Sequence, residues 1–386
     1  MLLFSTQKET LLSALEVANK AIPSKTIVQA LEGFKIEVKD GKVFITGSDL
    51  DTTINTSFSV IDYQNGAIVI EASLFTEYVK KLNGNISIKQ TEENRIEISS
   101  GKSKSVMICN KADEYPEIKK NDEKPVLANV VQSEFLEALT ETLYTVAKEE
   151  IRPILTGINF KMQYDEGKRG GFLTLAGLDG YRFAYRTLAV DSEEKVSVTV
   201  PAKGLQQLIK LLKNNDKNIK ISFYQNTITF ELENETKIQM RLLEGEFIPY
   251  EKIIPGEFKE KLIINREELL ESIGRVSLMA GDKQTPLVIM NLSADNITIS
   301  ADSNTGNAVD QIKPIAYEGE PLKIAFNSNY WKQLLNSLTC KQVECCFNSN
   351  VNPVVVRKYE DKKEIDNYIG LVLPVRIASA NAAVAA

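Results

Sequence analysis

The sequence predicts an α+β fold built from three tandem copies of one domain, each with two helices packed on antiparallel sheets. Two observations predict this fold. Two amphipathic helix patterns each occur three times in the same order, and segments that alternate apolar and polar residues lie between and after them. Each copy would contain about 125 residues, which is the size of a domain rather than of a solenoid repeat.

The first helix pattern covers residues 8–21, 132–147 and 265–280. In each copy, two adjacent bulky residues precede a polar residue, a small residue and a further apolar one. This spacing places the apolar side chains on one helical stripe that faces a core. The stripe residues are Leu11, Leu12, Ala14 and Leu15; Phe135, Leu136, Ala138 and Leu139; and Leu269, Leu270, Ser272 and Ile273.

The second helix pattern covers residues 71–82, 201–212 and 327–338, so successive copies begin 130 and 126 residues apart. Aligning the three segments brings Phe75, Leu205 and Trp331 into register. Such regular offsets indicate duplication of a whole domain rather than a chance similarity of helices.

Strand patterns fill the rest of each copy. Between the two helices, Asp49, Asp179 and Asp302 lie in turns that we expect to be equivalent. A carboxylate repeated in three equivalent turns is expected to accept hydrogen bonds from turn backbone rather than to act in catalysis. After the second helix, residues 86–100, 219–233 and 343–358 each predict two strands around a polar turn.

Charged segments rich in Pro or Gly, at 121–125 and 255–260, mark the linkers between copies. We therefore expect domains at 1–121, 126–252 and 258–377. The small residues of 378–386 predict a disordered Ala-rich tail.

Composition excludes several classes of protein. The chain has 386 residues, 43% of them apolar, no histidine, four cysteines and a net charge of −6. Without histidine, and with Cys345 next to Cys346 on what we expect to be opposite faces of a strand, neither a metal site nor a cofactor is predicted. No segment approaches the roughly 20 apolar residues of a membrane span, and residues 1–10 lack the features of a signal peptide, so a cytoplasmic protein is expected.

The helix at 201–213 has a basic face. Leu205, Leu208, Ile209 and Leu212 form its apolar stripe, whereas Lys203, Gln206, Gln207, Lys210 and Lys213 lie on the other side without an acidic residue. Such a face can contact phosphate even though the whole chain is acidic.

Two other classes of protein remain possible from the residues alone. A hydrolase or lyase could use the carboxylates of Asp49 and Asp51, although three similar turns argue against a unique cleft. A β-rich scaffold that binds proteins but not DNA is the other alternative. The basic face of 201–213 argues against it.

Several segments in order resemble the bacterial DNA polymerase III beta subunit, the beta sliding clamp family, over residues 1 to 377. These segments are 45–51, 152–160, 178–184, 200–212, 242–255 and 368–377. The resemblance implies a non-catalytic processivity factor. Two chains would join head to tail into a six-domain ring that encircles double-stranded DNA without regard to sequence, and the replicative polymerase, the clamp loader and other proteins would dock on it.

The resemblance also implies two sets of site residues. A hydrophobic pocket for partner peptides would lie between the second and third domains, and the inner face of the ring would contact DNA. The pocket residues would be Arg152, Ile154, Leu155, Leu178, Gly180, Tyr181, Arg182, Phe183, Ile248, Ile253, Leu371, Leu373, Pro374, Val375 and Arg376; the DNA-facing residues would be Lys25, Lys80, Lys81, Lys203, Lys210, Lys213 and Lys332.

The sequence departs from the family pattern at three places. Ile248 stands where many clamps have proline, residues 26–31 lack the usual proline, and the chain continues past Ile377. Ile248 affects the expected shape of the pocket, and the end of the chain borders it. The alternative that Phe183 and Leu373 are ordinary core residues stays open at this point.

Overall fold

The computed structural model describes residues 1–386 except 119–120, 150, 166–169, 282–284, 361–362 and 377–386. The expected tail and Ile377 therefore lie outside the described residues. The chain divides into two compact units. The first unit comprises Met1–Leu136, Val190–Val196 and Lys203–Leu242; the second comprises Glu137–Ala189, Ser197–Ala202 and Leu243–Ala386.

All six expected helices are present. They begin at the expected residue or one residue later, and they end earlier than expected because their last residues turn into 3₁₀ or extended backbone. After the first helix, for example, Asn19–Ala21 forms a 3₁₀ turn. The helices are α1 (Lys8–Ala18), α2 (Ala72–Lys81), α3 (Gln132–Leu143), α4 (Ala202–Ile209), α5 (Arg266–Ser277) and α6 (Ser328–Ser337).

The first unit contains two antiparallel sheets. The smaller sheet has the order β5-β1-β7-β8-β9, and the larger has the order β10-β6-β2-β3-β4-β18-β17-β16-β11. The strands are β1 (Leu3–Gln7), β2 (Gly33–Lys39), β3 (Lys42–Ser48), β4 (Thr52–Ser59), β5 (Tyr63–Gln64), β6 (Gly66–Glu71), β7 (Asn85–Glu92), β8 (Arg95–Ser100), β9 (Ser103–Ile108), β10 (Asn110–Lys111), β11 (Val126–Val131), β16 (Asn218–Phe223), β17 (Thr227–Leu232) and β18 (Thr236–Arg241).

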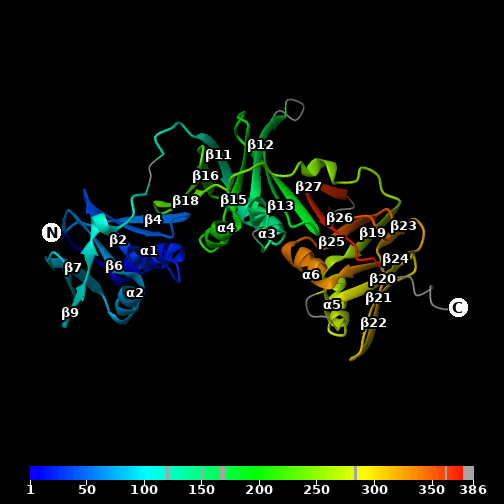
Figure 1. Cartoon of the computed structure of the whole chain (residues 1–386), viewed down its shortest axis with the longest axis horizontal. Helices are drawn as coiled ribbons and strands as arrows, with labels where there is room; N and C mark the ends of the chain where they lie inside the picture. The colour runs from blue at the N-terminus through cyan, green and yellow to red at the C-terminus, as the bar shows by residue number, and fades with distance from the viewer. Residues whose placement is uncertain (119–120, 150, 166–169, 282–284, 361–362, 377–386) are drawn as a thin grey trace. The chain divides into compact units, whose positions relative to one another are not determined.

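One apolar core joins both sheets of the first unit to α1 and α2. Leu11 and Leu15 from α1 and Phe75 from α2 are fully buried, as the stripe pattern predicts. They pack with Phe4 of the smaller sheet and Phe34 of the larger one. Figure 1 shows the two helices side by side in this unit.

The second unit repeats this arrangement. Its larger sheet has the order β15-β12-β13-β14-β27-β26-β25-β19-β23, and its smaller sheet has the order β22-β21-β20-β24. The strands are β12 (Gly157–Asp165), β13 (Gly170–Leu178), β14 (Arg182–Val190), β15 (Val196–Pro201), β19 (Glu260–Asn265), β20 (Leu287–Leu292), β21 (Ile297–Ser303), β22 (Gly306–Ile312), β23 (Ala316–Glu318), β24 (Leu322–Asn327), β25 (Gln342–Phe347), β26 (Val354–Glu360) and β27 (Lys363–Val372).

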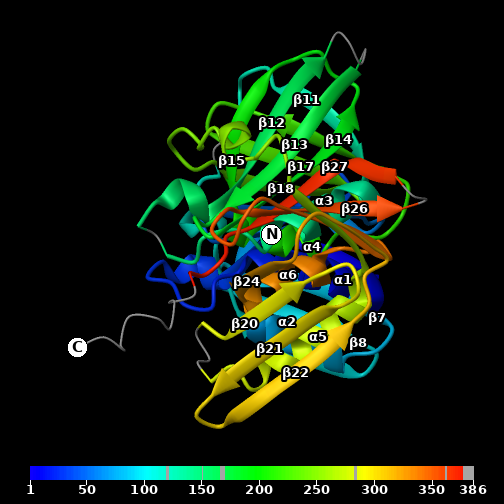
Figure 2. The ribbon, with the colours of Figure 1, turned by 90° about the vertical axis from the view of Figure 1, so that its right-hand side faces the viewer.

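The core of the second unit joins α5 and α6 to both of its sheets. Ile273 of α5 and Trp331 of α6 are fully buried there, together with Met290 and Cys345. The next residue, Cys346, packs in a separate apolar cluster, so the two cysteines lie on opposite faces of β25 as expected. Figure 2 shows β20, β21 and β22 running side by side, with β22 at the edge.

Each large sheet is shared by two successive copies of the repeat. In the first unit, β4 of the first copy pairs with β18 of the middle copy. In the second unit, β14 of the middle copy pairs with β27 of the third. We call these pairings the first and the second junction. Leu373 N–H donates to the Tyr181 carbonyl at 2.9 Å, and Arg241 N–H donates to the Asp51 carbonyl at 2.8 Å, so the two junctions end in the same way.

The expected equivalence of the three turns is correct for two of them. Asp49 Oδ1 accepts hydrogen bonds from the N–H groups of Asp51 and Thr52, and Asp179 Oδ1 accepts the corresponding bonds in its own turn. The expectation was wrong for Asp302, which lies within β21. Ser303 takes the turn position instead, and its hydroxyl accepts the N–H of Thr305 at 3.3 Å. A serine hydroxyl supports a turn as a carboxylate does, only more weakly.

Within the described ranges, no helix is long and apolar enough to cross a membrane.

Candidate functional site

The expected pocket residues all belong to the second unit, where they separate into buried and exposed groups. Four of them, Leu155, Leu178, Phe183 and Leu371, are buried in one apolar cluster. Ile154, Ile248 and Leu373 are partly buried and pack against the same cluster. Phe183 is fully buried, so it can form part of the floor of a pocket but not its accessible surface.

The other expected pocket residues lie around this cluster. Tyr181 is 60% exposed, Val375 39% and Ile253 37%. Arg152, Gly180 and Arg376 are exposed, and Pro374 is half-buried. The combination of a buried apolar floor with exposed apolar and cationic side chains at its border is typical of a site for a peptide with hydrophobic anchors.

Arg182 is the exception, because it is a buried cation. Its Nε donates to Asp179 Oδ2 at 2.9 Å, and its guanidinium also contacts Gln333. The guanidinium carbon lies 4.8 Å from the ring centre of Tyr330 and 5.5 Å from that of Tyr144. These contacts give Arg182 a fixed position, so it acts as part of the scaffold of the site.

Two tyrosines at this site were missed by the sequence reasoning. Tyr330 stacks on Tyr181 with ring centres 6.0 Å apart, and Tyr250 lies 5.2 Å from the ring of Phe183. Burial raises the pKa of both hydroxyls. Tyr330 belongs to α6, and the pattern of that helix does not indicate its contact with Tyr181 of the middle copy.

The first junction carries charges where the second carries apolar groups. At the position of Tyr181 it has Asp51, and at the position of Leu373 it has Arg241. Lys203 Nζ lies 2.6 Å from Asp49 Oδ2 beside them. A surface of this kind offers no apolar floor to a peptide anchor.

The expected DNA-facing lysines are at the surface, but several already have partners. Lys25, Lys81 and Lys213 are exposed. Lys80 pairs with Glu77 at 2.9 Å, a contact that raises the pKa of Lys80, and Lys203 pairs with Asp49.

Two further lysines of this set donate to neutral side chains. Lys210 Nζ lies 3.2 Å from Gln207 Oε1. Lys332 is half-buried, and its Nζ donates to Ser277 Oγ at 3.2 Å in a hollow of about 410 Å³. None of these contacts is strong enough to prevent exchange for a phosphate.

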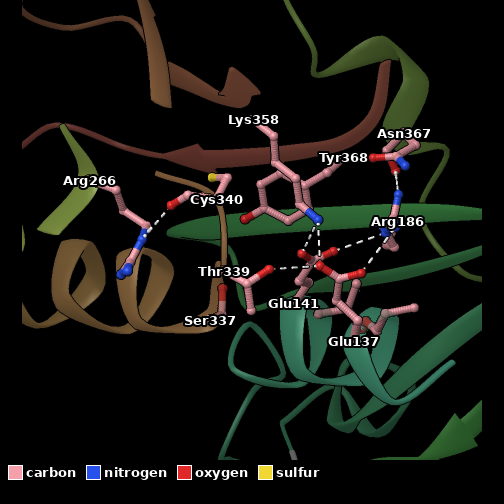
Figure 3. A network of polar contacts seen from close by, with 12 residues as sticks. Glu137, Glu141, Arg186, Arg266, Ser337, Thr339, Cys340, Lys358, Asn367 and Tyr368 are labelled. Carbon is pink, nitrogen blue, oxygen red and sulfur yellow. Dashed lines mark hydrogen bonds and ion pairs between the residues drawn. The ribbon is translucent and has the colours of Figure 1, made fainter. Parts of the chain in front are cut away.

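A cluster of four charged side chains lies at the second junction (Figure 3). Glu137 and Glu141 come from α3, Arg186 from β14 and Lys358 from β26. Arg186 Nε lies 3.0 Å from Glu141 Oε2, and Lys358 Nζ lies 3.0 Å from Glu137 Oε1 and also contacts Glu141. We call these four residues the charge cluster.

The two carboxyl groups of the charge cluster differ in their protonation. Burial raises the pKa of Glu141 to about 7, against the attraction of Lys358 and Arg186. Burial acts on Glu137 too, but contacts with Lys358, Thr339 and Arg186 hold its pKa below the ordinary value. The partners of the Glu141 carboxylate are the ammonium group of Lys358 and the guanidinium group of Arg186.

One of the two carboxylates of the alternative enzyme hypothesis, that of Asp49, has a structural role. Both oxygens of Asp49 are engaged, one by turn backbone and one by Lys203. Across the described ranges, no group of three or more Cys, Asp or Glu side chains is arranged to hold a metal ion.

Comparison with known families identifies the fold. Models of the N-terminal, central and C-terminal domains of the DNA polymerase III beta subunit match residues 2–119, 129–249 and 251–371. The chain is thus made of three tandem clamp domains. It belongs to the DNA polymerase III beta subunit family, the non-catalytic DNA sliding clamps.

Individual relatives agree over nearly the whole length. The beta sliding clamp of Bacillus subtilis is 31% identical, covering 97% of this chain and 99% of that protein, and that of Staphylococcus aureus is 28% identical over 97% and 100%. A crystal structure of the Bacillus subtilis clamp matches with a TM-score of 0.91 at 29% identity, covering 97% and 99% of the two chains. A Pseudomonas aeruginosa clamp bound to griselimycin shares the fold, with a TM-score of 0.90 at 23% identity over 97% and 100%.

Proposed function

We propose that this sliding clamp works as a ring of two copies joined head to tail, which encircles duplex DNA and tethers the replicative polymerase through a peptide pocket on the second unit. The proposal keeps the domain boundaries 1–121, 126–252 and 258–377. A protein that acts on bacterial chromosomal DNA works in the cytoplasm, which is where we place it.

The observation that carries the ring is a pair of apolar sheet edges. Among the described strands, β9 has a neighbour on one side only, and its Val106 and Ile108 are 56% and 74% exposed. At the other end of the chain, β22 is also an edge, with Val309 exposed. Bare apolar edges promote aggregation unless another strand covers them. Pairing β9 of one copy with β22 of the next covers both edges and closes the ring after two copies.

Contacts with DNA in such a ring are weak and independent of sequence. The candidates are exposed or half-buried lysines, which contact phosphates and not bases. Several of them already have an acidic or polar partner, so each can exchange that partner for a phosphate at little cost. Weak exchangeable contacts allow the ring to slide.

The peptide pocket is assigned to the second junction alone. Its support is the apolar floor around Phe183 with Leu373 and Tyr181 at the border. The first junction has Asp51 and Arg241 at the equivalent places. Each chain therefore offers one peptide site, and the ring offers two.

Retention on DNA tests the central proposal. The protein is loaded with clamp loader and ATP onto nicked circular DNA, and onto the same DNA after linearisation, and is then separated by gel filtration. We expect retention on the circles and loss from the linear molecules. Equal retention on both would show binding without encirclement and would overturn the ring.

A further inference from the structure

We propose that the charge cluster of Glu137, Glu141, Arg186 and Lys358 positions β27 against β14 and thereby holds one wall of the proposed peptide pocket in place. The inference rests on the proposed function for its second half, the pocket. Its first half, the positioning of β27, stands on contacts within the second unit alone.

The position of Arg186 is the first step. Arg186 faces Tyr368 at one end of the β14–β27 pairing, and Phe183 faces Leu371 near the other end. Leu371 belongs to the pocket floor, whereas its neighbour Val372 packs in the core of α5 and α6. A slip of one residue would exchange these two faces, so the register of β27 decides whether the floor exists.

The second step is an irregularity that makes the register of β27 vulnerable. The pairing of β26 with β27 shifts between Val356 and Lys358. Lys358 stands directly after this shift, and its ammonium group contacts both carboxylates of α3. Arg186 reaches the same two carboxylates from β14 and approaches the Asn367 carbonyl of β27 at 3.5 Å. The cluster therefore ties α3, β14 and β26 together around the start of the β27 pairing (Figure 3).

The third step is a comparison of the two junctions, which are built alike. At the first junction, the counterpart of Arg186 is Thr56, whose hydroxyl lies 2.9 Å from that of Thr236. The stripe alignment of α1 with α3 gives Ser13 and Val17 as counterparts of Glu137 and Glu141. In the described part of the chain, the first junction thus forms without a buried charge. The buried charges of the cluster lie at the second junction, where we propose the pocket.

The energetic cost of burying these charges also favours a positioning role for the charge cluster. Side chains of Glu141, Lys358 and Arg186 are 0%, 6% and 8% exposed, and burying such charges costs stability that their mutual attraction does not fully return. Buried ionic networks can instead specify one arrangement among close alternatives. The other groups facing the cluster are uncharged in the neutral range, because burial raises the pKa of Tyr368, Tyr144 and Cys340.

The test is a charge-balance cycle. Glu141→Gln leaves the cluster with one excess positive charge, Lys358→Met leaves one excess negative charge, and the double variant is balanced again. Lys261→Met, at an exposed lysine of β19 in the same sheet, is the matched control. The full-length variants are compared by hydrogen exchange at the amides of 370–372 and by the affinity for a fluorescent polymerase-derived peptide.

At pH 8, where Glu141 is mostly ionised, we expect each single variant to exchange these amides about tenfold faster and to bind the peptide about tenfold more weakly, and the double variant to recover most of both losses. If Lys358→Met fails to fold, Glu141→Gln and the double variant still complete the comparison.

Two results would overturn the inference. Unchanged exchange in the single variants would show that the cluster does not position β27. A double variant no better than the sum of the single ones would show that charge balance is irrelevant. If wild-type protein binds no peptide while the exchange results hold, the pocket is refuted and the positioning of β27 remains.

Discussion

Lys203 Nζ and Asp49 Oδ2 lie 2.6 Å apart although 154 residues separate them in the chain. The pair links the turn between β3 and β4 to the first turn of α4. Lys203 was expected on a basic face without acidic residues, and within α4 itself that is correct. The acidic partner comes from another copy of the repeat, so the lysine carries less free charge than the helix pattern indicates.

Asp49→Asn tests this pairing. Asparagine keeps an oxygen that can accept the turn N–H groups, but it releases Lys203 for a phosphate. We expect duplex binding at low salt to tighten about two- to threefold, and the slope of log K against log salt to steepen by up to about one. Fluorescence anisotropy across a salt series measures both. Asp51→Asn, an exposed carboxylate in the same turn, is the control; equal effects from both would show a general charge effect.

The backbone of the two equivalent turns leads to a paired prediction. Leu50 has a φ of 75° and Gly180 a φ of 92°, so a leucine occupies a left-handed position that its counterpart fills with glycine. Leu50→Gly should stabilise the protein by up to about 1 kcal/mol, and Gly180→Ala should destabilise it by about 1–2 kcal/mol. A Cβ at Gly180 would meet no atom within 4 Å, so only backbone strain is tested. Denaturant titration reports both; Leu50→Ala, which keeps the Cβ, should bring no gain.

The pocket floor and border should respond differently to truncation. Phe183→Ala removes a fully buried ring and should cost about 3–5 kcal/mol of stability. Leu373→Ala and Tyr181→Ala remove partly buried and exposed groups, so they should weaken peptide binding while the melting temperature stays nearly constant. Calorimetry of peptide binding and of unfolding separates the two effects. Full peptide affinity in a folded Leu373→Ala, Tyr181→Ala variant would remove the pocket assignment.

Charges placed on the edge of β9 should open the ring. Val106→Asp with Ile108→Asp puts two carboxylates on the surface proposed to pair with β22. We expect the sedimentation coefficient to fall to that of a monomer, with the circular dichroism unchanged. Lys39→Asp, at an exposed lysine of β2 in the other sheet of this unit, changes the net charge by the same amount and is the control for charge alone. A double variant that remains dimeric would place the interface elsewhere.

Stability should depend on pH through Glu141. Its pKa in the folded chain is about 7, above the ordinary value of 4.5, so the folded state holds this proton more tightly than the unfolded state. The stability it contributes is present below pH 4.5 and is lost as pH rises through 7.

Glu141→Gln removes the carboxyl group that binds this proton. The stability of Glu141→Gln relative to wild type should therefore rise by about 1–3 kcal/mol between pH 4.5 and 8. Urea titrations at four pH values measure the difference, with the exposed Glu267→Gln as control. A difference independent of pH would contradict the raised pKa.

The threefold fold could be predicted from sequence because each copy repeats its helix stripes and turn residues within one chain. Leu11, Phe135 and Leu269 occupy one stripe position, and all three are fully buried. Helix ends were less predictable, since a stripe continues through a 3₁₀ turn such as Asn19–Ala21. Asp302 was misplaced because serine and aspartate can exchange roles in a turn.

The charge cluster could not be predicted. Glu137 and Glu141 stand one helical turn apart on α3, opposite its apolar stripe, and such residues are normally solvated. Glu141 is buried and Glu137 partly buried, because strands from far along the chain cover that face of the helix. No pattern within α3 indicates this. The same holds for Tyr330, whose role depends on a partner, Tyr181, in a different copy.

The pairing of β14 with β27 also limits how this protein can be divided. A fragment that stops after the middle copy would leave the strand segment Arg182–Arg186 without the neighbour it has in the full chain. Such a fragment would be prone to associate through this unpaired strand edge. Shortened versions for screening or crystallisation should therefore retain the third copy whole.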